Sequence, residues 1–425
     1  MAIIINTIPP LQSRFFGPML DLLPNFKSFR VCPKISDSDW LTLGICRVIE
    51  SVLSGRDFLQ SMKAKLHVPC VGRFFSSLKS KRRLAVCAEA NEALCAIMTQ
   101  TVPDVFREYS QLDDFDLYAA DGHAHAHATH DPAKPSKSSA TGFAKFGTSH
   151  IYTLDLRTHA LSHLALADQI SRRKEHEMRT LKRLEIDQMR QGAPPGRKVL
   201  YLYDPACIDY TYWYQLKRKG IYFVTVMKSN ASLTRCGSYS YDINDPINAG
   251  VLFDDQVGIA GIMVRQIQYQ CPQTGEIFEF LTNEINIPPG LIARLYRMRW
   301  DIEKTYDEVK NKFQEKKAWA SSATAKTMQA WFICLAHNLM VIQEHKLRTE
   351  EGVTNTSEIK RKAKRLQTEI ERLAEKNEVL PVLLRDFQRL TQRSVKYIRW
   401  LRAFLFVPAP WINVVAALRE SYAIS

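Results

Sequence analysis

The order of strand-like and helix-like segments between residues 113 and 230 limits the folds that this chain can adopt. A first apolar run is followed by two runs that a four-residue turn joins into a probable hairpin, and then by strands that alternate with helices. The strand-like runs are residues 115–120, 151–156, 161–166, 198–203 and 222–227, and a charged helix without glycine or proline covers 171–191. This order predicts a mixed sheet with helices on its faces. A dinucleotide-binding sheet would need helices between its first strands and a GxGxxG turn, and the sequence has neither.

The segments on either side of this predicted sheet differ from it in residue pattern and composition. Residues 1–112 have apolar residues at helical spacing, and the stretch 68–83 mixes aromatic residues with a basic cluster. We interpret them as a helical N-terminal DNA-binding region, although a helical cap with a solvated basic face has the same pattern. We assign 113–345 to one domain with a β-rich insertion at about 230–287, in which 261–270 and 276–281 are strand-like. Residues 346–425 form a helical C-terminal region, with a highly charged helix at 357–375.

The charge balance favours a polyanionic partner. The chain has 58 Lys and Arg against 44 Asp and Glu, a formal net charge of +14, and each phosphate contact releases condensed counterions. The nine cysteines are odd in number and include no CxxC pair, which argues against a disulfide framework and suits a reducing cytosol. Apolar runs are too short for a signal-peptide core or a membrane span. We therefore expect an intracellular protein without a membrane partner.

One predicted helix carries a polar stripe of four different chemical groups. It begins after Pro288-Pro289-Gly290 and continues to about Lys317. Its stripe residues are Tyr296, Arg299, Glu303 and Lys310, at offsets of 3, 7 and 14 residues. On an ideal helix these positions lie within roughly 60° of one another. The neighbouring apolar face is expected to pack on the sheet, which would bring the Glu303 carboxylate to the ends of the strands.

Two aspartates follow predicted strands. Asp121-Gly122 ends the first strand of the core and Asp204 ends the strand at 198–203. Isolated acidic residues in such places are commonly caps or turn formers. Three carboxylates from separate elements are also what Mg²⁺ requires, because it prefers oxygen ligands in near-octahedral geometry.

The stripe Tyr-x2-Arg-x3-Glu-x6-Lys resembles the YREK signature of bacterial insertion-sequence transposases of the DDE class. The preceding Phe280-Leu281-Thr282-Asn283, the two strand-end aspartates and the β-rich insertion are also similar to that group, over roughly residues 113 to 345. Two positions depart from it. Pro205-Ala206 stands where members often have Arg-Gly, and Val226 stands where they often have Arg two residues before the lysine matched by Lys228.

The resemblance implies a ribonuclease-H-like catalytic domain with a five-stranded mixed sheet, whose strand order agrees with the one given above. It implies that Asp121, Asp204 and Glu303 are the catalytic residues and hold Mg²⁺ (or Mn²⁺), with two ions per active site. It also implies phosphate contacts from Tyr296, Arg299 and Lys310, and with weaker support from Lys228 and Arg297. For Tyr296, packing of the helix on the sheet is an equal alternative.

The implied activity is cleavage at transposon ends and strand transfer into target DNA. The implied partners are double-stranded DNA, as terminal inverted repeats and target, and a second copy of the chain in a homodimer on the DNA. The expected location is the bacterial cytoplasm, in association with the nucleoid. A transposase-derived DNA-binding protein that no longer cuts is the alternative function.

The histidines at positions 123, 125, 127 and 130 suggest a metal site, because imidazole is a good zinc ligand. A hydrolase that uses them would be a third possible function. However, Mg²⁺ does not seek imidazole, and the segment 123–149 reads as a polar loop. We predict that these histidines lie on a surface loop or next to DNA.

Overall fold

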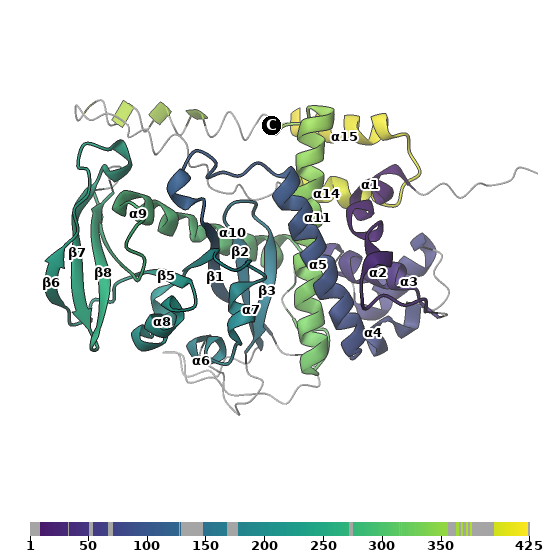
Figure 1. Cartoon of the computed structure of the whole chain (residues 1–425). Helices are drawn as coiled ribbons and strands as arrows, with labels where there is room; N and C mark the ends of the chain where they lie inside the picture. The colour runs from purple at the N-terminus through teal and green to yellow at the C-terminus, as the bar shows by residue number, and fades with distance from the viewer. Residues whose placement is uncertain are drawn as a thin grey trace, which may run out of the picture.

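The computed structural model describes residues 9–423 apart from 33, 51–53, 67–70, 127, 129–147, 168–176, 272–274, 314, 316, 356–362, 365–366, 369–370, 373–374 and 376–394. Within these residues the centre of the molecule is a nine-stranded sheet, in the order β3-β2-β1-β4-β5-β9-β8-β7-β6 (Figure 1). Its strands are β1 (Phe115–His125), β2 (Thr148–Asp155), β3 (Leu161–Leu166), β4 (Lys198–Leu202), β5 (Ile221–Val226), β6 (Thr234–Ser238), β7 (Val251–Ile259), β8 (Ile262–Gln270) and β9 (Ile277–Thr282).

The pairing of β1 to β5 follows the order that the sequence predicts. β1 pairs antiparallel with β2, and β2 with β3, whereas β1, β4 and β5 are mutually parallel. The mixed sheet with flanking helices is consistent with the ribonuclease-H-like fold.

The prediction of a five-stranded sheet is wrong, because the β-rich insertion continues the same sheet. β9 pairs antiparallel with β5, with Val224 opposite Thr282, and β8, β7 and β6 follow as an antiparallel meander. The insertion thus covers the edge of β5, which would otherwise present unpaired backbone groups. Two insertion strands, β8 and β9, match the predicted segments, and β6 and β7 are additional.

Helices cover both faces of the sheet, and the two faces have separate apolar cores. Alternate strand residues such as Leu117 and Leu202 join the core on the side of the later helices, whereas Ala120 and Tyr201 join the opposite core. The first face is covered by α9 (Pro289–Met298), α10 (Trp300–Asp307), the π-helical turn η6 (Glu308–Lys312) and α11 (Ala323–Glu351). The second is covered by α6 (Glu177–Leu181), α7 (Ile186–Arg190) and α8 (Tyr210–Lys217).

The helix predicted at 171–191 is divided. Its first residues lie outside the described part of the chain, and the rest forms α6 and α7 with a turn between them. Glu185 has an extended backbone before α7. The Gln188 side chain accepts a hydrogen bond from the Glu185 backbone N–H at 3.0 Å, which is half of a capping box. A new helix therefore begins at residue 186, inside the predicted one.

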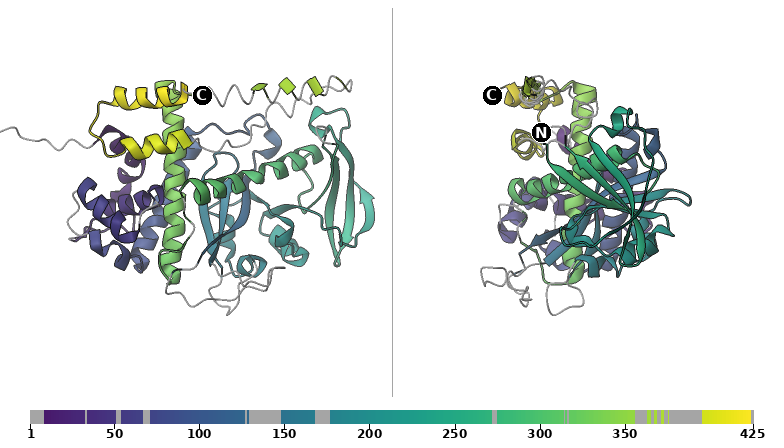
Figure 2. Two further views of the ribbon diagram at one scale, coloured as in Figure 1. Left: turned by 180° about the vertical axis from the view of Figure 1, so that it is seen from behind. Right: turned by 90° about the vertical axis from the view of Figure 1, so that its left-hand side faces the viewer.

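The terminal helices gather around α11. The long α11 contacts β3 on one side and α2 (Asp37–Ile49) and α5 (Lys81–Thr101) on the other, so it stands between the sheet and the N-terminal helices (Figure 2). The remaining terminal helices are α1 (Pro10–Leu20), α3 (Gly55–Leu66), α4 (Phe74–Ser77), α14 (Val395–Phe404) and α15 (Trp411–Ala423). The charged helix predicted at 357–375 lies for the most part outside the described residues.

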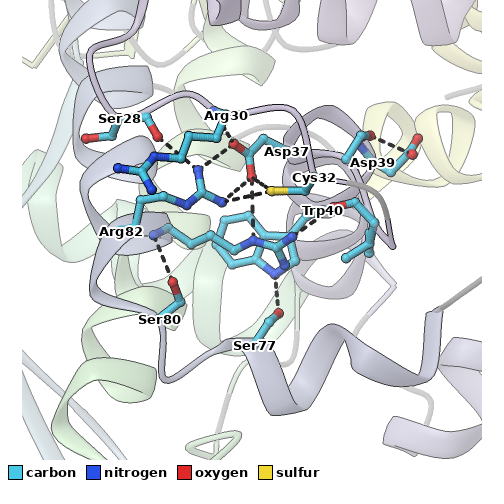
Figure 3. Close-up of polar contacts among 12 residues, drawn as sticks. Ser28, Arg30, Cys32, Asp37, Asp39, Trp40, Ser77, Ser80 and Arg82 are labelled. Atoms are coloured by element: carbon cyan, nitrogen blue, oxygen red, sulfur yellow. Dashed lines mark hydrogen bonds and ion pairs between the residues drawn. The ribbon is translucent and has the colours of Figure 1, made fainter.

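Part of the basic cluster near residue 80 has a structural role (Figure 3). The fully buried Asp37 carboxylate accepts two hydrogen bonds from the Arg82 guanidinium, at 2.6 and 2.7 Å. The neighbouring Arg83 is also buried and donates to the Ile35 carbonyl at 2.9 Å. These two arginines hold the start of α2 against α5, whereas Lys79 and Lys81 are exposed. Arg82 and Arg83 are therefore committed within the fold, and the exposed Arg73, Lys79 and Lys81 of the stretch 68–83 remain accessible to a phosphate.

Candidate active site

The strand register places the two predicted aspartates at the same end of the sheet. Ala119 of β1 lies opposite Leu202 of β4 in the last parallel pair, so Asp121 and Asp204 each stand two residues beyond that pair. Side chains two residues apart on a strand point to the same side. Asp204 also caps the short 3-10 helix η4 (Pro205–Cys207), since one carboxylate oxygen accepts from the Ala206 N–H at 2.9 Å. The capping interpretation and the site interpretation of Asp204 are thus compatible.

Asp121 lies in an environment that disfavours its negative charge. Burial raises the pKa of this carboxyl from its ordinary value to about 7, and the charges of Glu177 and Asp204 act in the same direction. The Gly122 N–H, which donates to the Asp121 carboxylate at 2.8 Å, and the charge of Arg299 only partly oppose this effect. Several acidic groups therefore converge here with too little positive charge to balance them. A cation would relieve this imbalance and favour the ionised form.

Arg299 connects the predicted glutamate to the aspartates. It lies where α9 passes into α10, and its guanidinium forms an ion pair with Glu303 at 2.8 Å. The same guanidinium is buried, and its charge also acts on Asp121. Tyr296 is buried one turn earlier, with its ring 5.5 Å from the Arg299 guanidinium carbon and within the electrostatic reach of Asp204. Tyr296 therefore both packs in the core and lies near the candidate site.

The other predicted DNA contacts are spread over a wider surface. Lys310 is exposed on η6, and its charge acts on His123 of β1. Because η6 is a π-helical turn, Lys310 does not keep the angular position around the helix axis that an ideal α-helix predicts. Lys228 is exposed just after β5. Arg297 is exposed on α9, and its charge acts on Tyr269 of β8. Arg297 thus lies toward the insertion rather than beside the aspartates.

Two residues beside the aspartates were not predicted from the sequence. Ligand atoms of Glu177, Asp204 and Cys207 all lie within 4.8 Å of one another, the one such group of metal-ligating side chains in the described residues. Glu177 begins α6 and Cys207 ends η4. The Cys207 thiol donates to the Glu177 carboxylate at 3.4 Å, and burial raises the pKa of this thiol. Gly122 is the sequence feature that points to such a neighbour, because a glycine beside Asp121 leaves room for a side chain from another element.

Comparison with known protein families decides the family of this chain. The model of the transposase DDE domain matches residues 117–339, which is more than half of the sequence. The chain belongs to this family. The matched residues of this transposase domain begin in β1 and end in α11, and they include Asp121, Asp204 and the helix with Glu303. Members of the family are enzymes of the nuclease and transposase class that use divalent metal ions. No curated protein matches the chain.

The histidine run of the transposase domain is not a loop throughout, and the prediction for its first half is wrong. β1 continues to His125, and both His123 and His125 are buried. His123 stacks on Tyr306 with ring centroids 4.7 Å apart, and His125 Nδ1 lies 3.1 Å from the Glu315 carbonyl. Alternation on the strand directs both rings into the core under α10 and η6, so they are not DNA contacts. His127 and His130 lie outside the described residues.

The same buried layer continues across β2 and β3. His150 Nδ1 lies 3.0 Å from His163 Nε2, and the rings of His125 and His150 are 5.7 Å apart. The Tyr306 hydroxyl donates to the Asp121 backbone carbonyl at 2.7 Å, so α10 is fastened to the strand that carries the first aspartate. This layer of buried rings therefore packs against the strand that carries Asp121.

Within the described part of the transposase, every helix is too short or too polar to cross a bilayer.

The buried layer predicts a specific loss of stability in acid. Burial lowers the pKa of His125 to about 4, against about 6.5 in an unfolded chain. The unfolded chain therefore binds this proton below pH 6.5 while the folded protein does not, so stability is complete above pH 6.5 and falls toward pH 4. His125→Asn keeps a donor toward the Glu315 carbonyl but cannot titrate. We expect the variant to be less stable at pH 7.5, and the gap to wild type to shrink by about 1.4 kcal/mol per pH unit below 6.5.

Urea unfolding of both proteins between pH 7.5 and 4.5 measures this gap. His345→Asn is the control, because His345 lies on α11 and is only partly buried, so its removal changes the pH dependence much less. A gap between wild type and His125→Asn that stays constant with pH would show that folding does not lower the pKa of His125.

Proposed function

We propose that this protein is an active DNA transposase that cleaves DNA at the 3′ ends of its element and joins those ends to target DNA. The observation that supports the proposal is that Asp121 and Asp204 hold equivalent positions on two adjacent parallel strands, and that the charge of Arg299, the ion-pair partner of Glu303, acts on Asp121. A ribonuclease-H-like sheet with this arrangement, in a chain of the transposase family, supports an Asp-Asp-Glu active site.

The residues present fit the divalent ions that the family uses. The carboxylates of Asp121, Asp204 and Glu303 offer hard oxygen ligands from three separate elements, and the acidic crowding around Asp121 is what a cation would neutralise. Mg²⁺, or Mn²⁺ in its place, is the ion of this chemistry, and two ions would suit it. When bound, such ions activate a water or 3′-hydroxyl and stabilise the leaving oxygen.

The chain's own residues then have separate roles. Asp121 would hold an ion as a carboxylate, because a bound cation lowers the raised pKa of this group and its proton is released to solvent. Arg299 holds Glu303 in an ion pair. When DNA binds, the Arg299 guanidinium exchanges this partner for a DNA phosphate, which it binds in bidentate fashion. The hydrogen bond from Tyr306 to the Asp121 carbonyl keeps α10 and β1 in register during this exchange.

Double-stranded DNA is the proposed partner. The net charge of +14 favours it. We propose that the helical region 1–112 binds the terminal repeats through its exposed lysines, and that Lys310 and Lys228 hold phosphates near the cut. Arg297 would contact DNA farther along, next to the insertion. We further propose that 113–345 is the catalytic domain, that two copies pair on the DNA, and that the complex acts at the bacterial nucleoid.

An assay on element-end DNA tests this proposal. Purified protein is incubated with labelled duplexes that carry the inverted repeats flanking its gene, with Mg²⁺ or with EDTA. Binding is followed by gel shift and nicking on denaturing gels. The proposal expects binding under both conditions and 3′-end nicks only with Mg²⁺. Binding without nicks would instead support the second candidate, a transposase-derived DNA-binding protein, and cleavage of free small esters without DNA would support a hydrolase.

A further inference from the structure

We propose that Glu177 is a fourth carboxylate of the metal site, which binds the same divalent ions as Asp121 and Asp204 from the opposite face of the sheet. This inference rests on the proposed function, because it adds a ligand to the ions of that active site. Glu177 is the first residue of α6, whose Met178 and Leu181 belong to the core between the sheet and α6, α7 and α8. The candidate Glu303 comes from α10, which covers the other face of the sheet.

Distances support a shared site. The ligand atoms of Glu177 and Asp204 lie within 4.8 Å of each other, close enough to contact one ion. The charge of Glu177 also raises the pKa of Asp121, more strongly than the charge of Asp204 does. No lysine or arginine forms an ion pair with Glu177 among the described residues. The negative charges of Glu177 and Asp204 repel each other, and a cation bound between them removes this repulsion.

The glycine after Asp121 is an independent observation that points to the same role. A Cβ placed on Gly122 would lie 2.0 Å from one Glu177 carboxylate oxygen and 2.6 Å from its carboxyl carbon. The three nearest heavy atoms to that Cβ all belong to Glu177. The missing side chain therefore leaves room for the Glu177 carboxylate against β1, at the residue that follows Asp121. Any other residue at 122 would push the carboxylate away.

Cys207 is assigned a positioning role rather than a ligand role. Its thiol donates to the second Glu177 carboxylate oxygen at 3.4 Å and stays protonated, because burial raises its pKa. A protonated, soft sulfur is a poor ligand for Mg²⁺ or Mn²⁺, which prefer carboxylate oxygens. The thiol instead fixes the rotation of the Glu177 carboxyl group, as an outer hydrogen-bonding partner does at other metal sites.

Binding of Mn²⁺ to the purified full-length protein without DNA tests the inference. Free Mn²⁺ is measured by electron paramagnetic resonance during a titration, and the melting temperature is measured with and without the ion. We expect Glu177→Gln to weaken Mn²⁺ binding by about tenfold or more. We also expect it to raise the melting temperature of the metal-free protein, because one of the repelling charges is gone. A purely structural glutamate would not combine these two effects.

Gly122→Ala provides a second variant that leaves every acidic residue in place. Because the added Cβ meets only the flexible end of Glu177, the fold can adapt by moving that side chain, and Mn²⁺ binding is expected to weaken as in Glu177→Gln. Asp187→Asn is the matched control, since it removes one negative charge from an exposed position on the neighbouring α7. It is expected to bind Mn²⁺ like the wild type.

The outcomes separate this inference from the proposed function. Wild-type affinity in both Glu177→Gln and Gly122→Ala, with weakened binding in Asp121→Asn and Asp204→Asn, overturns the role of Glu177 and leaves the Asp-Asp-Glu site intact. Unchanged binding in the two aspartate variants as well, or no Mn²⁺ binding by the wild type, overturns both. Should Glu177→Gln fail to fold, as judged by circular dichroism, Gly122→Ala alone decides.

Discussion

Replacing Glu303 by glutamine is expected to lower metal-dependent cleavage of element ends by at least about 10³-fold, while end binding is retained. The physical reason is that the amide keeps the size of the side chain and can still accept a hydrogen bond from Arg299, but it no longer supplies an anionic ligand. Divalent ions contribute several kcal/mol of transition-state stabilisation, and each 1.36 kcal/mol is tenfold in rate. Single-turnover cleavage and gel shift, on the same labelled duplex, measure the two effects separately.

Asp307→Asn is the matched control for this change. Asp307 lies one turn further along α10, loses the same charge on substitution, and has a hydrogen-bonding partner in Asn311 rather than in the acidic cluster. Its cleavage rate is expected to stay close to that of the wild type. If Glu303→Gln cleaved at the wild-type rate, Glu303 would not be the third catalytic carboxylate, and the stripe on α9 and α10 would need another explanation.

The sequence predicted the parts of this site that depend on local patterns. Asp121 and Asp204 follow short apolar runs, and such runs are recognisable because parallel strands are buried on both faces, although β1 continues past Asp121 to His125. The helix with Glu303 combines an apolar face with a polar stripe of fixed spacing. Both features are encoded within about 15 residues, which is the range over which periodicity can be read.

Features that depend on distant partners were missed. Glu177 is one of many charged residues in a segment that reads as a solvated helix, and only the packing of α6 against the strand ends brings it to Gly122. His123 and His125 alternate with alanine, so the segment looked polar. On the strand, that alternation directs the histidines inward, where Tyr306 stacks on one of them. The alternation of histidine and alanine has the period of two that is typical of a strand, whereas the composition of the segment is typical of a loop.

The full number of strands in the sheet could not be predicted from local sequence patterns either. β7 includes two buried residues, Asp254 and Asp255, and charged residues interrupt the apolar pattern by which a strand is recognised. Asp254 is buried because Arg265 of the neighbouring β8 pairs with it, and the two positions are separated by a turn. A sequence read one segment at a time does not reveal that pairing. The pair is therefore both a reason for the missed strand and a feature that holds the insertion together.

Arg265→Met is expected to destabilise the protein by about 3–5 kcal/mol, the usual cost of leaving one member of a buried ion pair alone. Arg265 donates to the Asp254 carboxylate at 2.7 and 2.6 Å, and both side chains are almost completely buried. The same guanidinium donates to the Ile287 carbonyl at 2.7 Å, just before the prolines that begin α9. Methionine fills a similar volume but leaves the carboxylate and this carbonyl without donors. Urea unfolding followed by circular dichroism measures the loss.

Arg235→Met is the matched control, because it removes an arginine from the same meander whose own side chain lies in solvent. The Arg235 side chain is 68% exposed and pairs with Asp255 at 2.8 Å, and the buried Asp255 carboxylate keeps a hydrogen bond from the Ser238 hydroxyl at 2.7 Å when Arg235 is removed. We therefore expect a smaller loss of stability than in Arg265→Met. Equal losses in the two variants would contradict the burial argument. A large loss confined to Arg265→Met, accompanied by slower cleavage, would show that the insertion positions α9, and with it Arg299 and Glu303, through the chain segment that Arg265 holds.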